Sequence, residues 1–340
     1  MSARARRLHR VLALSVAGGL AISSVLAAAG PAAAVPVAEG DAVSTIDFDN
    51  DGGAPTCSAV TGDKSTVLPF SSDTAAKTVT NTSSTTVTDS ADTSDVTKMT
   101  GRSSTTAKLT AAGGSLRSID VNTSLRATYS AAQGFTTSCD TSATVLGGVE
   151  SAFKVAKPGW LTVTATKGKG GQAILAVGNM SGIFQTHTIR IRTIDSYRFY
   201  LPAAGDYLLQ AQVQVVAATP GDPVDQTEEA TTFKVHGEFR PAGAATGSPV
   251  GAGKHYLRLG AARLCAGNSL KTTFTPKAGK AKSAQLYVNG KRRAKVAFPK
   301  AGRVLTLKNL PGAKPVTVRA VIVPKQGKPV SVSRSYLACS

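Results

Sequence analysis

The sequence predicts an all-β protein, built of two or three tandem β-sandwich domains after a signal peptide. Apolar residues stand at every second position of Ile119–Tyr129, and polar residues separate them. The same alternation returns at Tyr207–Val215, where glutamines lie between the apolar residues. Gly and Pro punctuate these runs, as in "KPGW" and "LPAAGDY". Half-buried strands separated by turns are typical of β-sandwiches, and no amphipathic helix pattern follows the signal.

The N-terminus has the pattern of an export signal. Four arginines precede an uncharged apolar stretch, Val11–Ala29, and Ala32–Ala34 supplies a small-x-small cleavage pattern. We expect residues 1–34 to be removed, which leaves a secreted chain without a transmembrane segment. The alternative is an uncleaved anchor, because the apolar stretch is nearly long enough to span a bilayer.

The four cysteines indicate disulfides in an exported chain. Three connectivities exist, and spacing along the chain favours Cys57–Cys139 and Cys265–Cys339, with a loose segment between the two pairs. Four free thiols or a metal site are the alternatives, and no CxxC pair supports zinc.

The domain boundaries follow from composition. Residues 241–253, "PAGAATGSPVGAG", hold four glycines, two prolines and no charge, which is typical of a flexible linker. We therefore expect a β-sandwich region at 41–240, alternatively divided into 41–142 and 143–240, and a smaller sandwich at 254–340.

The segment Lys64–Thr110 is dominated by Thr and Ser. This composition fits either a disordered, mucin-like stalk or thin strands, because Thr favours strands. Its position between Cys57 and Cys139 favours strands.

Two segments resemble known families of secreted bacterial surface proteins. The segment Val155–Val216 resembles the jelly-roll (pre-peptidase C-terminal-like) domains appended to secreted peptidases, and the motifs "FKVAKPGWLTVTA" and "YRFYLPAAGDYLLQAQV" carry that resemblance. "LYVNGKRRAKV", "LTLKNLPGAKPVTVRAVIV" and "VSVSRSYLAC", within His255–Ser340, resemble bacterial immunoglobulin-like domains. The first resemblance implies a non-catalytic accessory module. The second implies a fold in which Cys265 and Cys339 tie the ends together, and it says little about function.

Charge is distributed very unevenly. The formal net charge is +19, and residues 251–340 contain 19 Lys and Arg but no Asp or Glu. Average composition would place on the order of ten acidic residues in such a segment. The C-terminal domain therefore carries an uncompensated positive charge.

The hairpin "AQLYVNGKRRAKVAF" predicts where part of this charge lies. A strict two-residue loop at Asn289-Gly290 would pair Leu286 with Arg293 on the core face. A three-residue loop with a glycine bulge instead places Leu286 with Ala294, Val296 and Phe298. We expect the second register, in which Lys291, Arg293 and Lys295 form a basic stripe on the solvent face beside Tyr287.

Such a surface predicts binding to anionic cell-wall polymers or acidic glycans through many weak, salt-sensitive contacts. We expect an extracellular protein, associated with the cell wall, that has no catalytic residues. Aromatic residues do not interleave with the basic ones, which argues against nucleic acid as the natural ligand. The alternative interpretation is that the charge serves solubility or pairs with the rest of the chain.

An acidic loop offers a second class of function. Asp47, Asp49, Asp51 and Gly52 have the spacing of positions 1, 3, 5 and 6 of a calcium loop, but Ser58 stands where a bidentate Glu is needed. A loose Ca²⁺ site or an Asp/Gly turn after a strand would both fit, and no other cofactor is expected. A carbohydrate- or calcium-dependent binding module, centred on this loop or on Trp160 as a sugar-stacking platform, is therefore the alternative function.

Catalytic motifs are weak. His187, His236 and His255 are scattered, and no GxSxG, HExxH or P-loop occurs. Ser151 and Lys154 match the SxxK spacing of acyl-transfer enzymes, but "SAFKVAKPGW" has the pattern of a strand and SxxK chemistry needs a helix.

Overall fold

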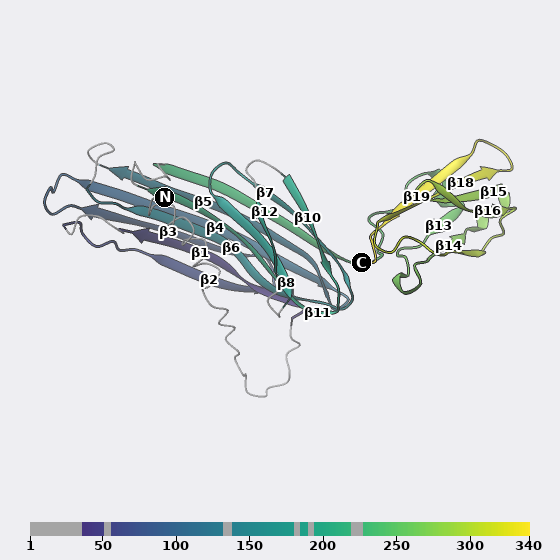
Figure 1. Cartoon of the computed structure of the whole chain (residues 1–340), viewed down its shortest axis with the longest axis horizontal. Coiled ribbons are helices and arrows are strands. Elements are labelled where there is room, and N and C mark those ends of the chain that lie inside the picture. Colours follow the sequence, from purple (N-terminus) through teal and green to yellow (C-terminus); the bar gives the residue numbers. More distant parts are fainter. Residues whose placement is uncertain (1–35, 51–55, 132–137, 180–183, 190–193, 219–226) are drawn as a thin grey trace, which may run out of the picture. The chain divides into compact units, whose positions relative to one another are not determined.

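The computed structural model is all-β and describes residues 36–50, 56–131, 138–179, 184–189, 194–218 and 227–340 (Figure 1). Every strand pairing within these residues is antiparallel, and the only helices in them are short 3₁₀ turns. The predicted fold class is confirmed. The expected signal peptide lies outside the described residues.

The first sandwich, within residues 36–241, consists of two six-stranded sheets. One sheet has the order β2 (Lys64–Ser71), β1 (Ala38–Asp49), β6 (Ser142–Val155), β11 (Gly205–Ala218), β8 (Gln172–Asn179) and β9 (Phe184–Ile189). The other has the order β10 (Ile194–Leu201), β7 (Gly159–Lys167), β12 (Glu228–Pro241), β5 (Ser115–Ala131), β4 (Val96–Ala112) and β3 (Lys77–Thr88).

The two halves of this region share both sheets. β1 pairs with β6, and β5 pairs with β12, so each sheet joins a block of strands from before residue 142 to a block of strands from after it. One hydrophobic core links them. The alternative division into 41–142 and 143–240 does not fit this sheet order, and the jelly-roll-like segment Val155–Val216 contributes strands to both sheets.

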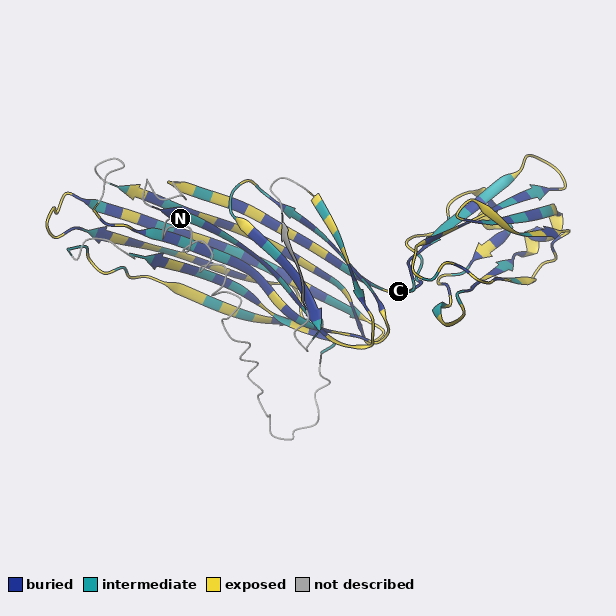
Figure 2. Cartoon of the chain, in the orientation of Figure 1, coloured by how far each residue is buried: buried dark blue, intermediate teal, exposed yellow. Residues whose placement is uncertain are grey.

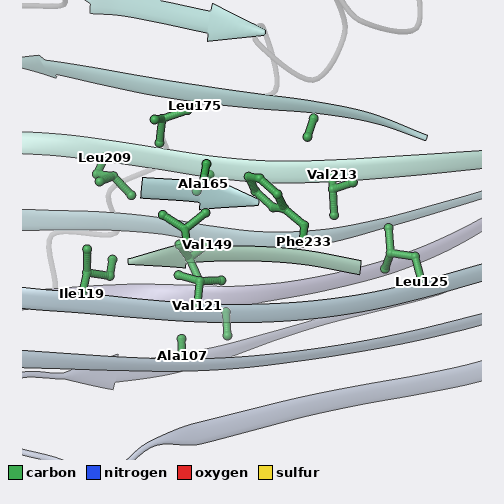
Figure 3. Close-up of a cluster of buried hydrophobic side chains, with 14 of the residues drawn as sticks. Ala107, Ile119, Val121, Leu125, Val149, Ala165, Leu175, Leu209, Val213 and Phe233 are labelled. Atoms are coloured by element: carbon green, nitrogen blue, oxygen red, sulfur yellow. The ribbon is translucent and has the colours of Figure 1, made fainter. Parts of the chain in front are cut away.

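The core lies between the sheets and is built from one face of each strand. Buried and exposed residues alternate along the strands, as Figure 2 shows. Figure 3 shows Val149, Leu209 and Val213 of one sheet gathered with Val121 and Phe233 of the other, and all five are buried. The period-two pattern of the sequence therefore places the apolar side chains of each strand between the two sheets. Removal of these side chains from water stabilises the fold.

The Thr-rich stretch forms β2, β3 and β4, which confirms its interpretation as strands. Its outer face carries hydroxyl pairs across the strands, such as Thr78 Oγ1 and Thr106 Oγ1 at 2.9 Å. Its inner face includes Asn81, which is buried. The Asn81 amide donates to Ser44 O at 2.9 Å, and its oxygen accepts from Thr66 Oγ1 at 3.0 Å. Both ends of the amide are thus satisfied, as a buried polar group requires.

Both predicted disulfides are present. Cys57–Cys139 closes the stretch that contains β2 to β5, and Cys265–Cys339 ties the end of the chain. In the chain-entropy model, each stabilises the fold by roughly 4 kcal/mol. Beside the first disulfide, Ser138 donates from its hydroxyl to Asp89, and its amide N–H donates to Asp95 Oδ2 at 2.9 Å. The hydrogen bond from Ser138 is the main cause that lowers the pKa of Asp89.

A buried lysine organises the turn between β7 and β8. Lys167 is 2% exposed, and its ammonium donates to the carbonyls of Gly168, Gly170 and Gly171. Burial lowers the pKa of Lys167, while the nearby carboxylate of Glu229 opposes that shift. Glu229 in turn accepts from the backbone N–H of Gly171 at 2.6 Å. The ion is therefore held by carbonyl groups that would otherwise be unpaired.

The second sandwich, within residues 257–336, has two smaller sheets and its own core. One sheet has the order β13 (Leu257–Leu259), β14 (Leu270–Phe274) and β17 (Val304–Leu307). The other has the order β16 (Lys291–Ala297), β15 (Ala281–Val288), β18 (Val316–Pro324) and β19 (Val330–Tyr336).

The segment expected to be a flexible linker is hydrogen-bonded to the second sandwich. Thr246 N donates to Ser335 O, and the backbones of Val250 and Ser333 bond to each other in both directions, each at 2.9 Å. These bonds run along β19, whose opposite edge pairs with β18. Free backbone groups at a sheet edge explain why a Gly-rich segment becomes ordered there.

Tyr336 makes the stability of the second sandwich depend on pH in the alkaline range. Its ring is fully buried and its hydroxyl donates to Gly260 O at 3.0 Å, and burial raises the pKa of Tyr336 to about 12. The neutral form is favoured in the folded state, so the unfolded chain loses this proton first. The contribution is complete below pH 10 and is lost as the pH rises towards 12.

We expect the free energy of unfolding to fall by about 2 kcal/mol more in the native protein than in Tyr336→Phe between pH 10 and 12. Denaturant unfolding at several alkaline pH values, followed with tyrosine absorbance, measures this difference. Parallel loss of stability in both proteins would contradict the assignment.

Candidate functional site

The cations of the second sandwich divide into two structural and many exposed ones. Of the Lys and Arg in residues 251–340, only Arg263 is buried and only Arg334 is half-buried; the others are exposed. Among the described residues, the ion pairs are Arg126–Glu228, His236–Asp120 and Arg240–Glu238, and all of them lie in the first sandwich. The positive charge of the second sandwich is thus directed to solvent.

Arg263 is a structural residue. It is 2% exposed and donates to four backbone carbonyls: those of Leu337 at 2.9 Å, Gly312 at 3.0 Å, Lys314 at 3.1 Å, and Pro311. Burial lowers the pKa of the guanidinium. These bonds join the loop before β18 to the end of the chain beside the disulfide, so Arg263 is unavailable to a ligand.

Arg334 is also engaged by backbone. Its Nε donates to Gly247 O at 2.8 Å, and its Nη1 donates to Gly260 O at 3.0 Å. It thereby connects β19 to the segment 241–253 and to the end of β13.

The hairpin between β15 and β16 has a register that neither sequence alternative described. Val288 pairs with Lys291 across a two-residue turn, in which Asn289 and Gly290 have φ of 47° and 79°. A bulge then shifts the register, so that Tyr287 pairs with Arg292 and Leu286 pairs with Ala294. The expected partnership of Leu286, Ala294 and Val296 is found, but the bulge within the strands produces it and not a three-residue loop.

Phe298 departs from its predicted place on the core face. It is 69% exposed, with φ of 47°, and follows the last residue of β16. The strand ends at Ala297, so the alternation no longer applies to Phe298.

The predicted basic residues lie on β16, at the edge of the four-stranded sheet. Lys291, Arg293 and Lys295 are all exposed. Lys295 pairs with Gln285 on the solvent face, Arg293 lies at the bulge, and Lys291 pairs with Val288 at the end of the hairpin. The bulge therefore breaks the predicted single stripe, because Lys291 shares its register with a core-facing residue.

The register also brings in two arginines that the sequence analysis missed. Tyr287 pairs with Arg292 on β16 and with Arg319 on β18, so both guanidinium side chains flank one tyrosine. Paired residues have Cβ atoms about 5 Å apart. Arg319 lies some 25 residues from the hairpin in sequence, and only its alternation within Val316–Pro324 could have indicated an outward side chain.

We call this surface the basic sheet face, and it consists of Tyr287, Arg292, Arg293, Lys295 and Arg319. The Tyr287 hydroxyl donates to Gln285 Oε1 at 2.8 Å, which fixes the ring in the middle of the face. Guanidinium groups on either side of a ring present forked donors that match phosphate and carboxylate oxygens. The arrangement suits an extended polyanion better than a single small ion, because the donors lie side by side along the sheet.

The acidic loop is described only in part. Asp47 and Asp49 lie in β1, where they pair with Thr144 and Ser142. Asp51 and Gly52 lie outside the described residues. No group of three or more His, Cys, Asp or Glu side chains able to hold a metal is found among the described residues.

Trp160 is held by protein contacts. Its indole N–H donates to Ala338 O at 3.0 Å, and its ring lies 4.9 Å from the ring of Tyr200. The Tyr200 hydroxyl donates to Cys339 O at 2.9 Å. The half-buried Trp160 therefore has a structural role at the end of β7.

The candidate catalytic residues do not converge. Ser151 and Lys154 both lie in β6, where residues three apart point to opposite faces, and the Ser151 hydroxyl donates to Glu39 O at 2.9 Å. His187 lies in β9, His236 in β12 and His255 in a 3₁₀ turn, Ala252–His255. His236 contacts an acidic side chain, with its Nδ1 at 2.6 Å from Asp120 Oδ1.

Comparison with known proteins gives no family. No protein-family model matches the chain, and no curated protein matches it significantly. Two solved structures that resemble it are a GH2 β-galacturonidase from Eisenbergiella tayi bound to glycerol and the same enzyme bound to galacturonate, each with 10% identity and a TM-score of 0.15. Each alignment covers 57% of this chain, and it covers 34% or 35% of the enzyme. Such scores carry no functional argument.

Within the described residues, no helix is long and apolar enough to cross a membrane.

The structural role of Arg263 can be tested. Arg263→Met leaves four carbonyls without their donor, and we expect a loss of about 3 kcal/mol in the free energy of unfolding. Lys308→Met removes the same charge from an exposed position and should change stability by less than about 0.5 kcal/mol. Equal effects in denaturant unfolding would contradict the role of Arg263.

Proposed function

We propose that the protein is a secreted, non-catalytic protein of the cell envelope that adheres to anionic polymers through the basic sheet face. One observation carries the proposal: the second sandwich exposes almost all of its cations, and none of them forms an ion pair with an acidic side chain of the described residues. If the surface had no role beyond keeping the folded domain soluble, we would expect it to carry both positive and negative side chains.

Electrostatics explains the mode of binding. Each exposed contact with an anion contributes at most about 1 kcal/mol, so affinity depends on the number of simultaneous contacts. A polymer that bears phosphate or carboxylate groups at regular intervals satisfies this condition. The field that steers it is screened within about 8 Å at physiological ionic strength, so binding must weaken as salt rises.

Our proposal also includes secretion of the protein and the resemblance of its two segments to known domain families. Two intact disulfides fit an oxidising compartment, and the seven strands of the second sandwich, in sheets of three and four, fit the immunoglobulin-like resemblance. The jelly-roll resemblance of Val155–Val216 is supported only by its strands and turns.

A charge-matched pair of variants tests the proposal. The triple variant Arg292→Gln/Lys295→Gln/Arg319→Gln removes charge from the basic sheet face, whereas Lys300→Gln/Lys308→Gln/Lys328→Gln removes the same charge from other exposed positions. We expect the native protein to bind immobilised heparin at 50 mM salt. The first triple variant should bind heparin at least tenfold more weakly than the native protein does. The loss of binding free energy in the second triple variant should be less than half of the loss in the first.

The salt dependence gives a second measurement. The logarithm of affinity should fall with the logarithm of salt concentration, and the slope should be shallower for the first triple variant. Failure of the native protein to bind at 50 mM salt would overturn the proposal. Equal losses in both triple variants would show that the basic sheet face has no special role.

A further inference from the structure

An open hollow of about 520 Å³ lies on the outer face of the first sandwich, and polar side chains stand among the groups that line it. It extends over β4, β5, β12 and β7, and Ala76 lies at its rim. Its lining side chains belong to outward-facing positions of these strands, apart from Val121 and Val235, which are buried beneath it. The hollow is thus a feature of the sheet surface and not a defect of the core.

The strand register arranges its polar groups in two rows. One row runs from Lys108 to Asp120, His236 and Thr164, each on the next strand. The other runs from Thr106 to Asn122, Lys234 and Thr166 in the same way. Short Thr and Asn side chains leave space between the longer Lys and His side chains, which explains the hollow.

The charges in the hollow are not balanced. His236 Nδ1 lies 2.6 Å from Asp120 Oδ1, so the one carboxylate of the lining is engaged by the imidazole. Lys108 and Lys234 are exposed, and neither takes part in the ion pairs found among the described residues. They lie on β4 and β12, which flank β5, so their strands are about 10 Å apart and a ligand lying across β5 is within reach of both side chains.

The chemistry of this lining selects a class of ligand. Two ammonium groups match an anion, and the Thr hydroxyls and the Asn122 amide match a unit rich in hydroxyl groups. No Phe, Tyr or Trp side chain lines the hollow, so the stacking that holds neutral sugars by their apolar face is missing there. We propose that this hollow binds a single anionic sugar unit, with its acidic group between Lys108 and Lys234 and its hydroxyls on Asn122 and the threonines.

This site is independent of the basic sheet face. It relies on short, directional hydrogen bonds, whereas the basic sheet face relies on long-range attraction. At 0.5 M salt the screening length is about 4 Å, so long-range attraction to the basic sheet face is suppressed, whereas hydrogen bonds within the hollow remain. Binding measured under that condition, and in the basic-face triple variant, therefore reports on the hollow alone.

The experiment is titration calorimetry of the full exported chain at 0.5 M salt with three probes: a glucuronic acid tetramer, glucose 6-phosphate and a neutral glucose tetramer. We expect at least one anionic probe to bind, and the neutral tetramer to bind at least tenfold more weakly. The two anionic probes distinguish a carboxylate from a phosphate. No binding of either anionic probe at 10 mM, or equal binding of the neutral tetramer, would overturn the proposal.

Matched variants locate the site. Lys108→Gln and Lys234→Gln should each weaken binding about threefold. Lys98→Gln, which changes another exposed lysine of β4 that lies outside the hollow, should leave binding unchanged. Asp120→Asn removes the one negative charge near the ligand and should strengthen binding by at least twofold. Equal losses for Lys98→Gln and Lys108→Gln, or weaker binding in Asp120→Asn with unchanged melting temperature, would overturn the assignment.

Discussion

Antiparallel pairing gives every strand of this protein two faces with different tasks, and the rest of the structure depends on this constraint. One face is buried between sheets, and the other is free of packing demands. Because the buried faces alone satisfy the hydrophobic requirement, the outer faces can differ greatly in chemistry. They are rich in hydroxyl groups on β3 and β4 and basic on β16 and β18.

Buried ions follow a common rule in both sandwiches. Lys167 and Arg263 are each surrounded mainly by backbone carbonyls at the end of a loop. A cation in such a position donates to backbone carbonyls that take no part in strand pairing. These carbonyls satisfy its donors without a carboxylate at hydrogen-bonding distance. Charge in this chain is therefore of two kinds, one used to close loops and one presented to solvent.

The two outer surfaces are suited to different ranges of interaction. In our proposals, the basic sheet face would attract an anionic polymer over the screening length through many weak contacts, whereas the hollow of the first sandwich would bind one unit through donors at fixed positions. Together they would allow one polymer to be attracted by its overall charge and held by one of its units. Linking two weak sites in one chain raises the effective affinity without new contacts at either.

The sequence by itself determined the fold class, the strand faces and both disulfides, because alternation, turn residues and cysteine spacing are local or nearly local signals. It also determined the excess charge of residues 251–340. Only the tertiary structure decided which side chains meet: the bulge opposite Tyr287 displaced Lys291, and pairing with β18 brought in Arg319. It also assembled Lys108, Asp120 and Lys234 from three strands. The physical reason is that register depends on pairing between distant segments, and a shift of one residue turns every side chain to the other face.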